Sequence, residues 1–337
     1  MTDRISLSQA FLTSIGWGTA RRSFLAGDAS DRSYDRLWRG TQTAVLMDAP
    51  PGKGDDPRAF IVMSQHLASL GLSPPRILAQ DLPNGFLLIE DLGDALFARL
   101  LANDLQSELP LYTAATDVLL TLQSNPPPPG LPDLSAADWA TAAGFALDWY
   151  CFAATGDRPD ATRFTQTLTS VLRRHADGPR VLILRDYHAE NLLLLPDRMG
   201  TARVGLLDFQ LAQLGQPGYD LVSLLQDARR DVSPDVERAM IARFARKTGS
   251  DPAVFAASYA ALGAQRALRI LGIFARLCLV GAKPQYLRLV PRVWGQLEHN
   301  LAHPALAPLA EVCADVLPPP TAPLLERIAQ QCGTHSP

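Results

Sequence analysis

The chain has 337 residues, of which 47% are apolar and 19% charged, and its formal net charge is -3. This apolar content excludes a disordered chain, and the length predicts two lobes, because single cores stop growing at roughly 250–300 residues. The near-neutral charge argues against a nucleic-acid partner. The longest apolar stretch, residues 260–282, is interrupted by Arg266, Arg269 and Arg276, so we expect a buried helix and no membrane span.

The four cysteines, Cys151, Cys278, Cys313 and Cys332, lie far apart and form no C-x-x-C pair. This spacing is not typical of a metal site or a disulfide framework, so we expect a reduced protein in the cytoplasm. Residues 1–26 contain no basic segment followed by an uninterrupted apolar run, so we expect no signal peptide.

The first ninety residues are rich in predicted strands. Apolar runs bounded by turn residues predict strands at residues 22–25, 33–38, 43–48, 76–81 and 85–91. Residues 7–15 predict a helix that begins with a capping box formed by Ser6 and Gln9. Residues 57–70 carry apolar side chains at helical spacing and end at Gly71, which predicts a helix between the third and fourth strands.

After Gly93 the pattern becomes mainly helical. The proline-rich residues 125–130 predict an extended connector. Short strands are expected at residues 180–184, 191–195 and 202–208. Helices are expected at residues 96–105, 109–124, 139–154, 161–175, 220–229, 234–247, 252–281, 283–299 and 324–331. The order of these elements predicts an α+β fold.

Two segments of the helical part carry chemistry. Asp186 follows an apolar strand, Asn191 lies five positions later, and Asp208 ends a second apolar strand seventeen residues after Asn191. Phosphoryl transfer needs this set, because one carboxylate receives the proton of the attacking hydroxyl while an amide oxygen and a second carboxylate hold Mg²⁺. A strand-end Asp is often only a turn former or a helix cap. The combination of both segments with a strand-rich region upstream favours the catalytic interpretation.

The chain resembles the aminoglycoside phosphotransferase family, which shares the protein-kinase-like fold. Within it the chain is similar to bacterial kinases of the anomeric hydroxyl of N-acetylmuramate and N-acetylglucosamine. The motifs include Arg-Asp-Tyr-His at 185–188 and Leu-Asp-Phe-Gln at 207–210. The stretches that carry the resemblance are residues 25–30, 45–51, 91–94, 185–188, 207–210, 219–225 and 271–276.

The resemblance implies a bilobal protein-kinase-like fold, with a small antiparallel-sheet lobe over residues 1–92 and a larger, mainly helical lobe over residues 93–337. ATP and Mg²⁺ are the implied cofactors, with Asp186 as catalytic base and Asn191 and Asp208 as metal ligands. The turn between the first two strands would cover the nucleotide phosphates, and the connector after the fifth strand would offer backbone groups to adenine. The implied nucleotide-binding residues are Gly27, Asp28, Ala29, Ser30, Arg32, Ser33, Met47, Glu90 and Leu92.

The sequence departs from the family pattern at two positions. Leu184 stands where the family usually has His, and Met47 stands where kinases carry the phosphate-binding Lys. The helix at 57–70 also lacks a Glu to pair with such a Lys. Three residues could supply the missing positive charge, namely Arg32, Arg36 and Lys53. A nucleotide-binding pseudokinase without catalysis is the alternative.

The acceptor is expected to contact the helical lobe. His188 would contact phosphate or substrate, or be a hydrogen-bonded loop histidine. Asp148 and Arg266 are the other predicted substrate residues, and the series Arg266, Arg269 and Arg276 favours a sugar that bears a carboxylate. These arginines could instead pair with surface acids. Asp220 is expected to cap a helix, with bracing of the catalytic loop as a further role.

The function that the resemblance implies is transfer of the γ-phosphate of ATP to an amino-sugar hydroxyl in peptidoglycan recycling. The alternatives are phosphorylation of an aminoglycoside, choline or another small alcohol. The expected partner is a small-molecule amino sugar, with no nucleic acid and no membrane, and the expected state is a monomer.

Overall fold

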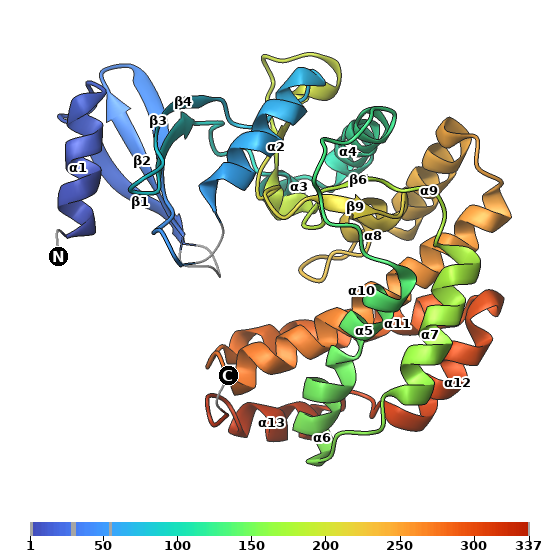
Figure 1. Ribbon diagram of the computed structural model, residues 1–337. Helices are drawn as coiled ribbons and strands as arrows, with labels where there is room; N and C mark the ends of the chain where they lie inside the picture. Colours follow the sequence, from blue (N-terminus) through green and yellow to red (C-terminus); the bar gives the residue numbers. More distant parts are fainter. Residues whose placement is uncertain (1–2, 28–31, 54–55, 336–337) are drawn as a thin grey trace. The chain divides into compact units, whose positions relative to one another are not determined.

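The computed structural model describes residues 3–27, 32–53 and 56–335. Contacts within the chain define two units (Figure 1): unit 1 is Met1–Pro128 with Ala189–Ala212, and unit 2 is Pro129–His188 with Gln213–Pro337. The boundary expected after Leu92 lies just beyond the end of the sheet at Glu90. Contacts assign residues 93–128 to the unit of the sheet, because these residues pack with the segment Ala189–Ala212.

Unit 1 is built on an antiparallel sheet, as the sequence predicts. Its strand order is β1-β2-β3-β5-β4, and every neighbouring pair is antiparallel. The strands are β1 (Arg21–Gly27), β2 (Ser33–Arg39), β3 (Gln42–Asp48), β4 (Ile77–Asp81) and β5 (Phe86–Glu90). Helix α2 (Pro57–Ser69) lies between β3 and β4 in the chain and is capped by Asp56, whose carboxylate accepts a hydrogen bond from the Arg58 N–H.

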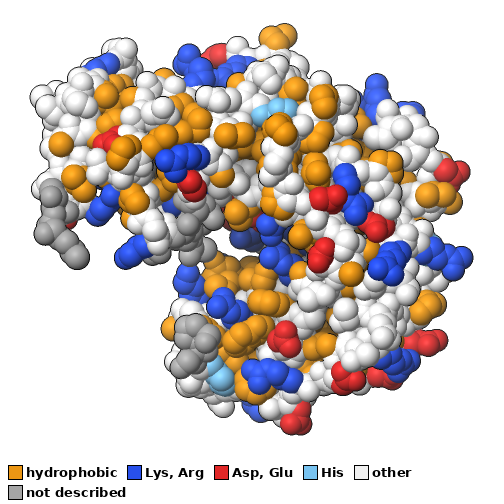
Figure 2. Space-filling model, viewed as in Figure 1, with side chains coloured by type: hydrophobic (Ala, Val, Ile, Leu, Met, Phe, Trp, Pro, Cys, Tyr) orange, Lys and Arg blue, Asp and Glu red, His pale blue; other side chains and the backbone are white. Residues whose placement is uncertain are grey.

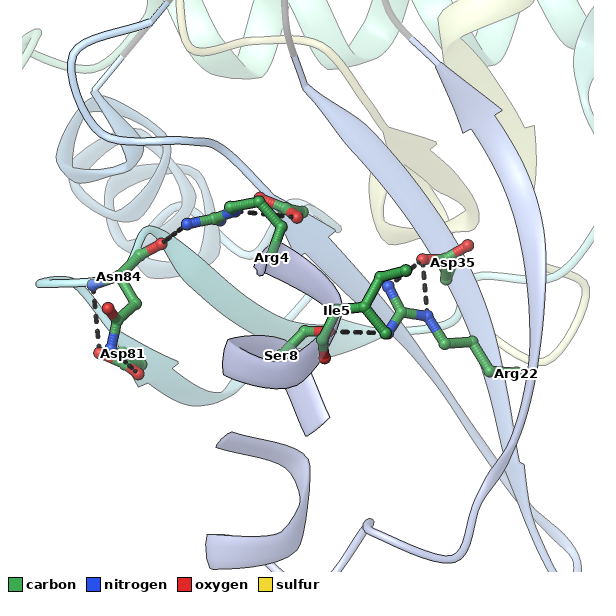
Figure 3. A network of polar contacts seen from close by, with 8 residues as sticks. Arg4, Ile5, Ser8, Arg22, Asp35, Asp81 and Asn84 are labelled. Atoms are coloured by element: carbon green, nitrogen blue, oxygen red, sulfur yellow. Dashed lines mark hydrogen bonds and ion pairs between the residues drawn. The ribbon is translucent and has the colours of Figure 1, made fainter. Parts of the chain in front are cut away.

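Helix α1 (Arg4–Ser14) covers one face of this sheet. Its residues Phe11 and Leu12 join a buried cluster with the strand residues Leu37, Ala44, Leu46, Phe86 and Leu88. Polar contacts fix its position (Figure 3): Arg4 pairs with Asp48 and donates to the Asn84 carbonyl at 2.7 Å. Because side chains alternate across a strand, the residues between those of the cluster face the other side of the sheet.

The predicted start of α1 is wrong. The helix begins at Arg4 after Asp3, so Ser6 lies inside the first turn and no side chain makes a capping bond at this end. The Ser8 hydroxyl instead donates to the Ile5 carbonyl at 2.9 Å and accepts from Arg22 at 2.8 Å (Figure 3). A helix of eleven residues is therefore positioned by side-chain contacts with the sheet more than by its cap.

The rest of unit 1 consists of helices that follow the sheet and a hairpin from a much later part of the sequence. Helices α3 (Phe97–Asn103) and α4 (Glu108–Gln123) follow the sheet, and the strands β7 (Leu192–Leu194) and β8 (Val204–Leu206) form an antiparallel pair. Single bridges between Ser73 and Gly205, and between Leu96 and Leu193, attach this hairpin to the first part of the chain. Unit 1 is therefore assembled from two separate chain segments.

Unit 2 is mainly helical and is organised around α10 (Pro252–Leu279). This 28-residue helix packs against α5, α7, α8, α11 and the π-helix η2. The other helices are α5 (Ala136–Ala143), η2 (Ala146–Cys151), α6 (Phe152–Thr155), α7 (Thr162–His175), α8 (Tyr219–Leu225), α9 (Pro234–Thr248), α11 (Val290–Leu301), α12 (Ala307–Val316) and α13 (Ala322–Gln330). A short antiparallel pair, β6 (Val181–Ile183) with β9 (Gln213–Gly215), carries the loop that contains Asp186.

Several boundaries in unit 2 differ from the predicted ones. The helix expected at 139–154 is divided into α5, η2 and α6, and α8 ends at Leu225 rather than at Arg229. Neither α12 nor β9 was predicted. On the face shown in Figure 2, positive and negative side chains are interspersed. Within the described ranges, no helix is long and apolar enough to cross a bilayer.

Candidate active site

Unit 1 contains a cavity of about 350 Å³, a volume in the range of small-molecule sites. Val45 of β3 and Ile89 of β5 line it, on the face of the sheet opposite α1. The connector after β5 and the β7–β8 hairpin complete the wall. Of the candidate residues named from the sequence, those that line the cavity are Gly27, Arg36, Glu90, Leu92, Asn191 and Asp208.

The β7–β8 hairpin brings the two predicted metal ligands together. Asn191 immediately precedes β7 and Asp208 follows β8 by two residues, so antiparallel pairing of Leu192 with Leu206 places them at the same end of the hairpin. The Leu207 N–H donates to the Asn191 carbonyl at 2.9 Å. Both side chains line the cavity, and oxygen ligands of this kind suit Mg²⁺, which uses one or two protein groups and completes its shell with phosphates and water.

Among the described residues, no cluster of three or more His, Cys, Asp or Glu side chains could enclose a metal ion. A site made of Asn191, Asp208 and nucleotide phosphates does not need such a cluster. The donor chemistry in the cavity therefore fits a magnesium–nucleotide complex better than a protein-enclosed metal.

Asp208 is held in position by neighbours on both sides. Its backbone has φ +55°, a conformation that few non-glycine residues adopt. Arg32 Nη2 lies 3.3 Å from its Oδ1, and Gln210 Nε2 donates to the same oxygen at 2.6 Å. The next residue, Phe209, stacks on Phe60 of α2 with ring centroids 4.9 Å apart. The Arg32 side chain is only 4% exposed, so its charge is directed inward to this carboxylate.

The predicted phosphate-covering turn is described only at its ends. Gly27 lines the cavity and pairs with Ser33 across β1 and β2. Asp28, Ala29 and Ser30 lie outside the described residues. Met47 is fully buried and, like Arg32 and Ser33, is not among the residues that line the cavity.

Arg36 links β2 to the connector after β5. Its Nη1 lies 2.8 Å from Asp94 Oδ2, and its Nη2 donates to Asp91 Oδ1 at 3.0 Å and to the Gly93 carbonyl at 3.2 Å. The hydrogen bond with Arg36 lowers the pKa of Asp94 below its usual range. The remaining candidate cation, Lys53, is exposed and does not line the cavity.

The connector residues Glu90 and Leu92 both line the cavity. The Glu90 carboxylate is already paired with Arg198 at 2.8 Å and with Arg76 at 3.1 Å. Leu92 rests over Gly205 of β8, where an added Cβ would lie 3.1 Å from Leu92 Cδ1. Leu92 thus contributes an apolar side chain to the wall of the cavity, and there is room for this side chain because Gly205 has none.

In unit 2, α8 holds the backbone immediately before Asp186. Arg185 has φ +72°, which strains a non-glycine residue. The Asp220 carboxylate accepts from the N–H groups of Leu184 at 2.6 Å and Arg185 at 2.9 Å, while the Ser223 hydroxyl donates to the Arg185 carbonyl at 3.1 Å. Hydrogen bonds therefore hold both backbone polar groups of Arg185, its N–H and its carbonyl. These bonds fix the direction of the backbone as it enters Asp186.

Asp220 is completely buried, and burial raises its pKa to about 7 against the opposing effect of the two N–H donors. The expected helix cap is wrong, because Asp220 lies inside α8 after Gly218 and no side chain makes a capping bond there, whereas the expected bracing of the catalytic loop is confirmed. Ser223 was missed at the sequence level. Its signal is its position three residues after Asp220, which places both side chains on one face of α8.

The three predicted substrate residues occupy different environments. Arg266 is buried, and its Nη2 donates to Ser223 Oγ at 2.7 Å, so it supports the loop from inside the unit. His188 is buried with Nε2 3.4 Å from Arg229 Nη1, and burial lowers its pKa well below the usual range. Asp148 is exposed on η2, beside the half-buried Trp149.

The structure combines an antiparallel sheet, the β7–β8 hairpin and a loop at Asp186 that is held by Asp220 and Ser223. Comparison with known protein families shows which class of protein has this arrangement. A model of the phosphotransferase enzyme family matches residues 21–257, and the chain belongs to this family. It is a kinase, and kinases of this family use ATP.

Two individual proteins are similar to this chain over most of its length. The chain is 39% identical to the N-acetylmuramate/N-acetylglucosamine kinase of Caulobacter vibrioides, over 91% of this chain and 95% of the relative. It is 34% identical to the Pseudomonas aeruginosa protein of the same name, over 89% of this chain and 91% of that protein.

Solved structures show the same fold at low identity. The microcompartment-associated aminopropanol kinase matches with a TM-score of 0.63 and 17% identity, over 90% of this chain and 99% of that one. A choline/ethanolamine kinase family protein of Mesorhizobium loti matches with a TM-score of 0.62 and 14% identity, over 97% of this chain and 100% of that one. The fold is therefore protein-kinase-like, as the resemblance implied.

Proposed function

We propose that this kinase transfers the γ-phosphate of ATP to the anomeric hydroxyl of an N-acetylated amino sugar, either N-acetylmuramate or N-acetylglucosamine. The observation that carries the proposal is the identity of 39% with a kinase named for these two sugars, over nearly the whole of both chains. The proposed role is recycling of cell-wall sugars by a monomer in the cytoplasm. The free state of all four cysteines supports that compartment.

On the nucleotide side, the cavity of unit 1 would hold adenine between the apolar sheet face and the connector at Leu92. Asn191 and Asp208 would hold Mg²⁺, which neutralises charge on the phosphates when bound. Arg32 is the proposed replacement for the kinase lysine, because it is buried against Asp208 whereas Arg36 is bound to Asp91 and Asp94.

On the acceptor side, Asp186 would orient the sugar hydroxyl and accept its proton as the oxygen attacks the γ-phosphorus. The bond from that phosphorus to the β-γ bridging oxygen breaks, and ADP leaves. Asn191 lies five positions after Asp186, so the proposed proton acceptor and this proposed metal ligand are close neighbours in the sequence. A rigid entry into Asp186, set by Asp220 and Ser223, suits a residue whose main task is orientation.

The proposal is tested by ³¹P NMR of reactions with ATP and each candidate acceptor. We expect a sugar 1-phosphate from the amino sugars and no product from choline or an aminoglycoside. Asp186→Asn should lower kcat by about 10²–10⁴-fold, since it removes the proton acceptor. Asp235→Asn, at an exposed position on α9, is the matched control and should keep full activity. No product with either sugar, or an Asp186→Asn enzyme as active as the wild type, would contradict the proposal.

A further inference from the structure

One face of α10 connects the catalytic loop to the π-helix η2. Arg266 on this face bonds to Ser223 of α8. Two turns further on, Gly272 lies so close to the Phe145 backbone that an added Cβ would overlap it. One turn beyond that, the Arg276 guanidinium lies 5.6 Å from the centre of the Trp149 ring. The stretch between Arg266 and Gly272 is therefore bounded at both ends by fixed contacts.

Arg269 lies in that stretch, one turn after Arg266 and on the same side of the helix. It is half-buried, and it makes no hydrogen bond or ion pair with any residue that the structure describes. This sets it apart from Arg266, which is bound to Ser223, and from Arg276, which is placed over Trp149.

The charges around Arg269 do not neutralise it. Burial lowers its pKa, the charges of Arg185 and Arg266 act in the same direction, and Tyr219 and Asp186 act in the opposite one. The guanidinium nevertheless stays charged at neutral pH, because arginine does not lose its proton in proteins. A half-buried cation without a close partner is costly, and a bound anion would remove that cost.

We propose that Arg269 binds the carboxylate of the acceptor and so sets the preference of the enzyme for N-acetylmuramate over N-acetylglucosamine. This inference rests on the proposed function. The two sugars differ by a lactyl ether whose carboxylate matches the fork of a guanidinium, with two parallel N–H···O bonds. Arg269 lies one turn from Arg266, which donates to Ser223, and Ser223 donates to the Arg185 carbonyl, so an acceptor held at Arg269 would lie close to the loop that contains Asp186.

The pair of acceptors provides the test. In Arg269→Met, kcat/KM for N-acetylmuramate should fall by about 10–100-fold, mainly through KM, because a charge-assisted bidentate contact is lost. The value for N-acetylglucosamine should stay within about threefold, which also shows that the variant folds. Arg269→Lys keeps the charge without the fork and should lie between the wild type and Arg269→Met. Arg238→Met, at an exposed arginine of α9, should change neither value.

Calorimetric titration of N-acetylmuramate and N-acetylglucosamine into the same variants, without nucleotide, gives a second readout. Only the acid should lose affinity in Arg269→Met. Equal losses for both sugars would overturn the inference, because Arg269 would then serve the transferred phosphate or the fold. Unchanged binding and turnover of N-acetylmuramate would overturn it as well. Turnover of neither sugar by the wild type would contradict the proposed function, while binding of the acid alone, lost in Arg269→Met, would still support the role of Arg269.

Discussion

At the scale of single residues, the main question is how this kinase binds triphosphate without a lysine on its third strand. The position holds Met47, which is buried out of the cavity. The Arg32 guanidinium occupies a buried position beside Asp208 instead. Under the proposed function, Mg²⁺ would bind the Asp208 carboxylate and Arg32 would contact the phosphates.

Replacing Arg32 by Met should weaken ATP binding by about 10–100-fold, because one charge-assisted contact to phosphate is lost. Adenosine, which has no phosphate, should bind wild type and variant equally. Lys53→Met is the matched control, since Lys53 is exposed away from the cavity. Displacement of a fluorescent nucleotide measures the affinity of the wild type and of both variants for ATP and for adenosine. A loss of affinity for adenosine as large as that for ATP would show that Arg32 shapes the cavity and does not bind phosphate.

The residues of the candidate site were predictable in part. Asp186 and Asp208 stood out as candidates because each follows an apolar strand, and Asn191 because it lies five positions after Asp186. The role of Arg266 could not, because spacing along a helix shows which arginines share a face and not which of them is directed inward. Only contacts separate Arg266, bound to Ser223, from Arg269, which has no such partner.

At the scale of elements, the break between α5 and η2 has a visible cause. Gly144 ends α5, and Gly272 of α10 lets the following turn at Phe145 approach the α10 backbone. The resulting π-helical turn carries Asp148 and Trp149, and it places the Trp149 ring beside Arg276. Such turns are often found at functional sites. Sequence periodicity predicted one continuous helix over 139–154, since the pattern of apolar residues does not record contacts with another helix.

Two glycine substitutions test this packing. Gly272→Ala should lower the free energy of unfolding by about 1–3 kcal/mol, because the new methyl group overlaps the Phe145 carbonyl and forces the helices apart. Gly295→Ala, inside α11 with open space around it, should raise the same quantity by about 0.5–1 kcal/mol through better helix propensity. Urea unfolding followed by circular dichroism measures both. If Gly272→Ala were as stabilising as Gly295→Ala, the close approach of η2 to α10 would be refuted.

At the scale of the whole molecule, the composition of the units was the least predictable feature. The strands of the sheet follow from turn residues and apolar runs, which are local signals. The attachment of residues 189–212 to unit 1 depends on contacts that span more than a hundred residues. Leu206 donates to the Ser73 carbonyl at 2.9 Å, and Ser73 Oγ donates to the Ala202 carbonyl at 2.7 Å. No local pattern in the sequence records such pairings.

Because unit 1 is assembled from two separate segments of the chain, we expect its fragments to differ in folding and in ATP binding. Residues 1–128 alone should unfold without a cooperative transition and should not bind ATP, because the hairpin that covers Ser73 and carries Asn191 and Asp208 is missing. A fragment in which residues 189–212 follow through a flexible linker should recover both properties. Circular dichroism in urea and fluorescent nucleotide titration provide the readouts. Cooperative unfolding and full ATP affinity of the shorter fragment would contradict the assignment of the hairpin to unit 1.

The same division sets an order of events on the ribosome. The amino-terminal sheet can form early, but its nucleotide unit stays incomplete until residue 212 has emerged, after the whole of 129–188 has been made. At ~5–20 residues per second this delay lasts several seconds. During that time the nascent chain exposes the apolar surface around Leu92 and Leu96 that β7 and β8 later cover. Synthesis therefore passes through a stage at which the rest of the protein does not yet cover this surface, and exposed apolar surface of this kind is prone to aggregation.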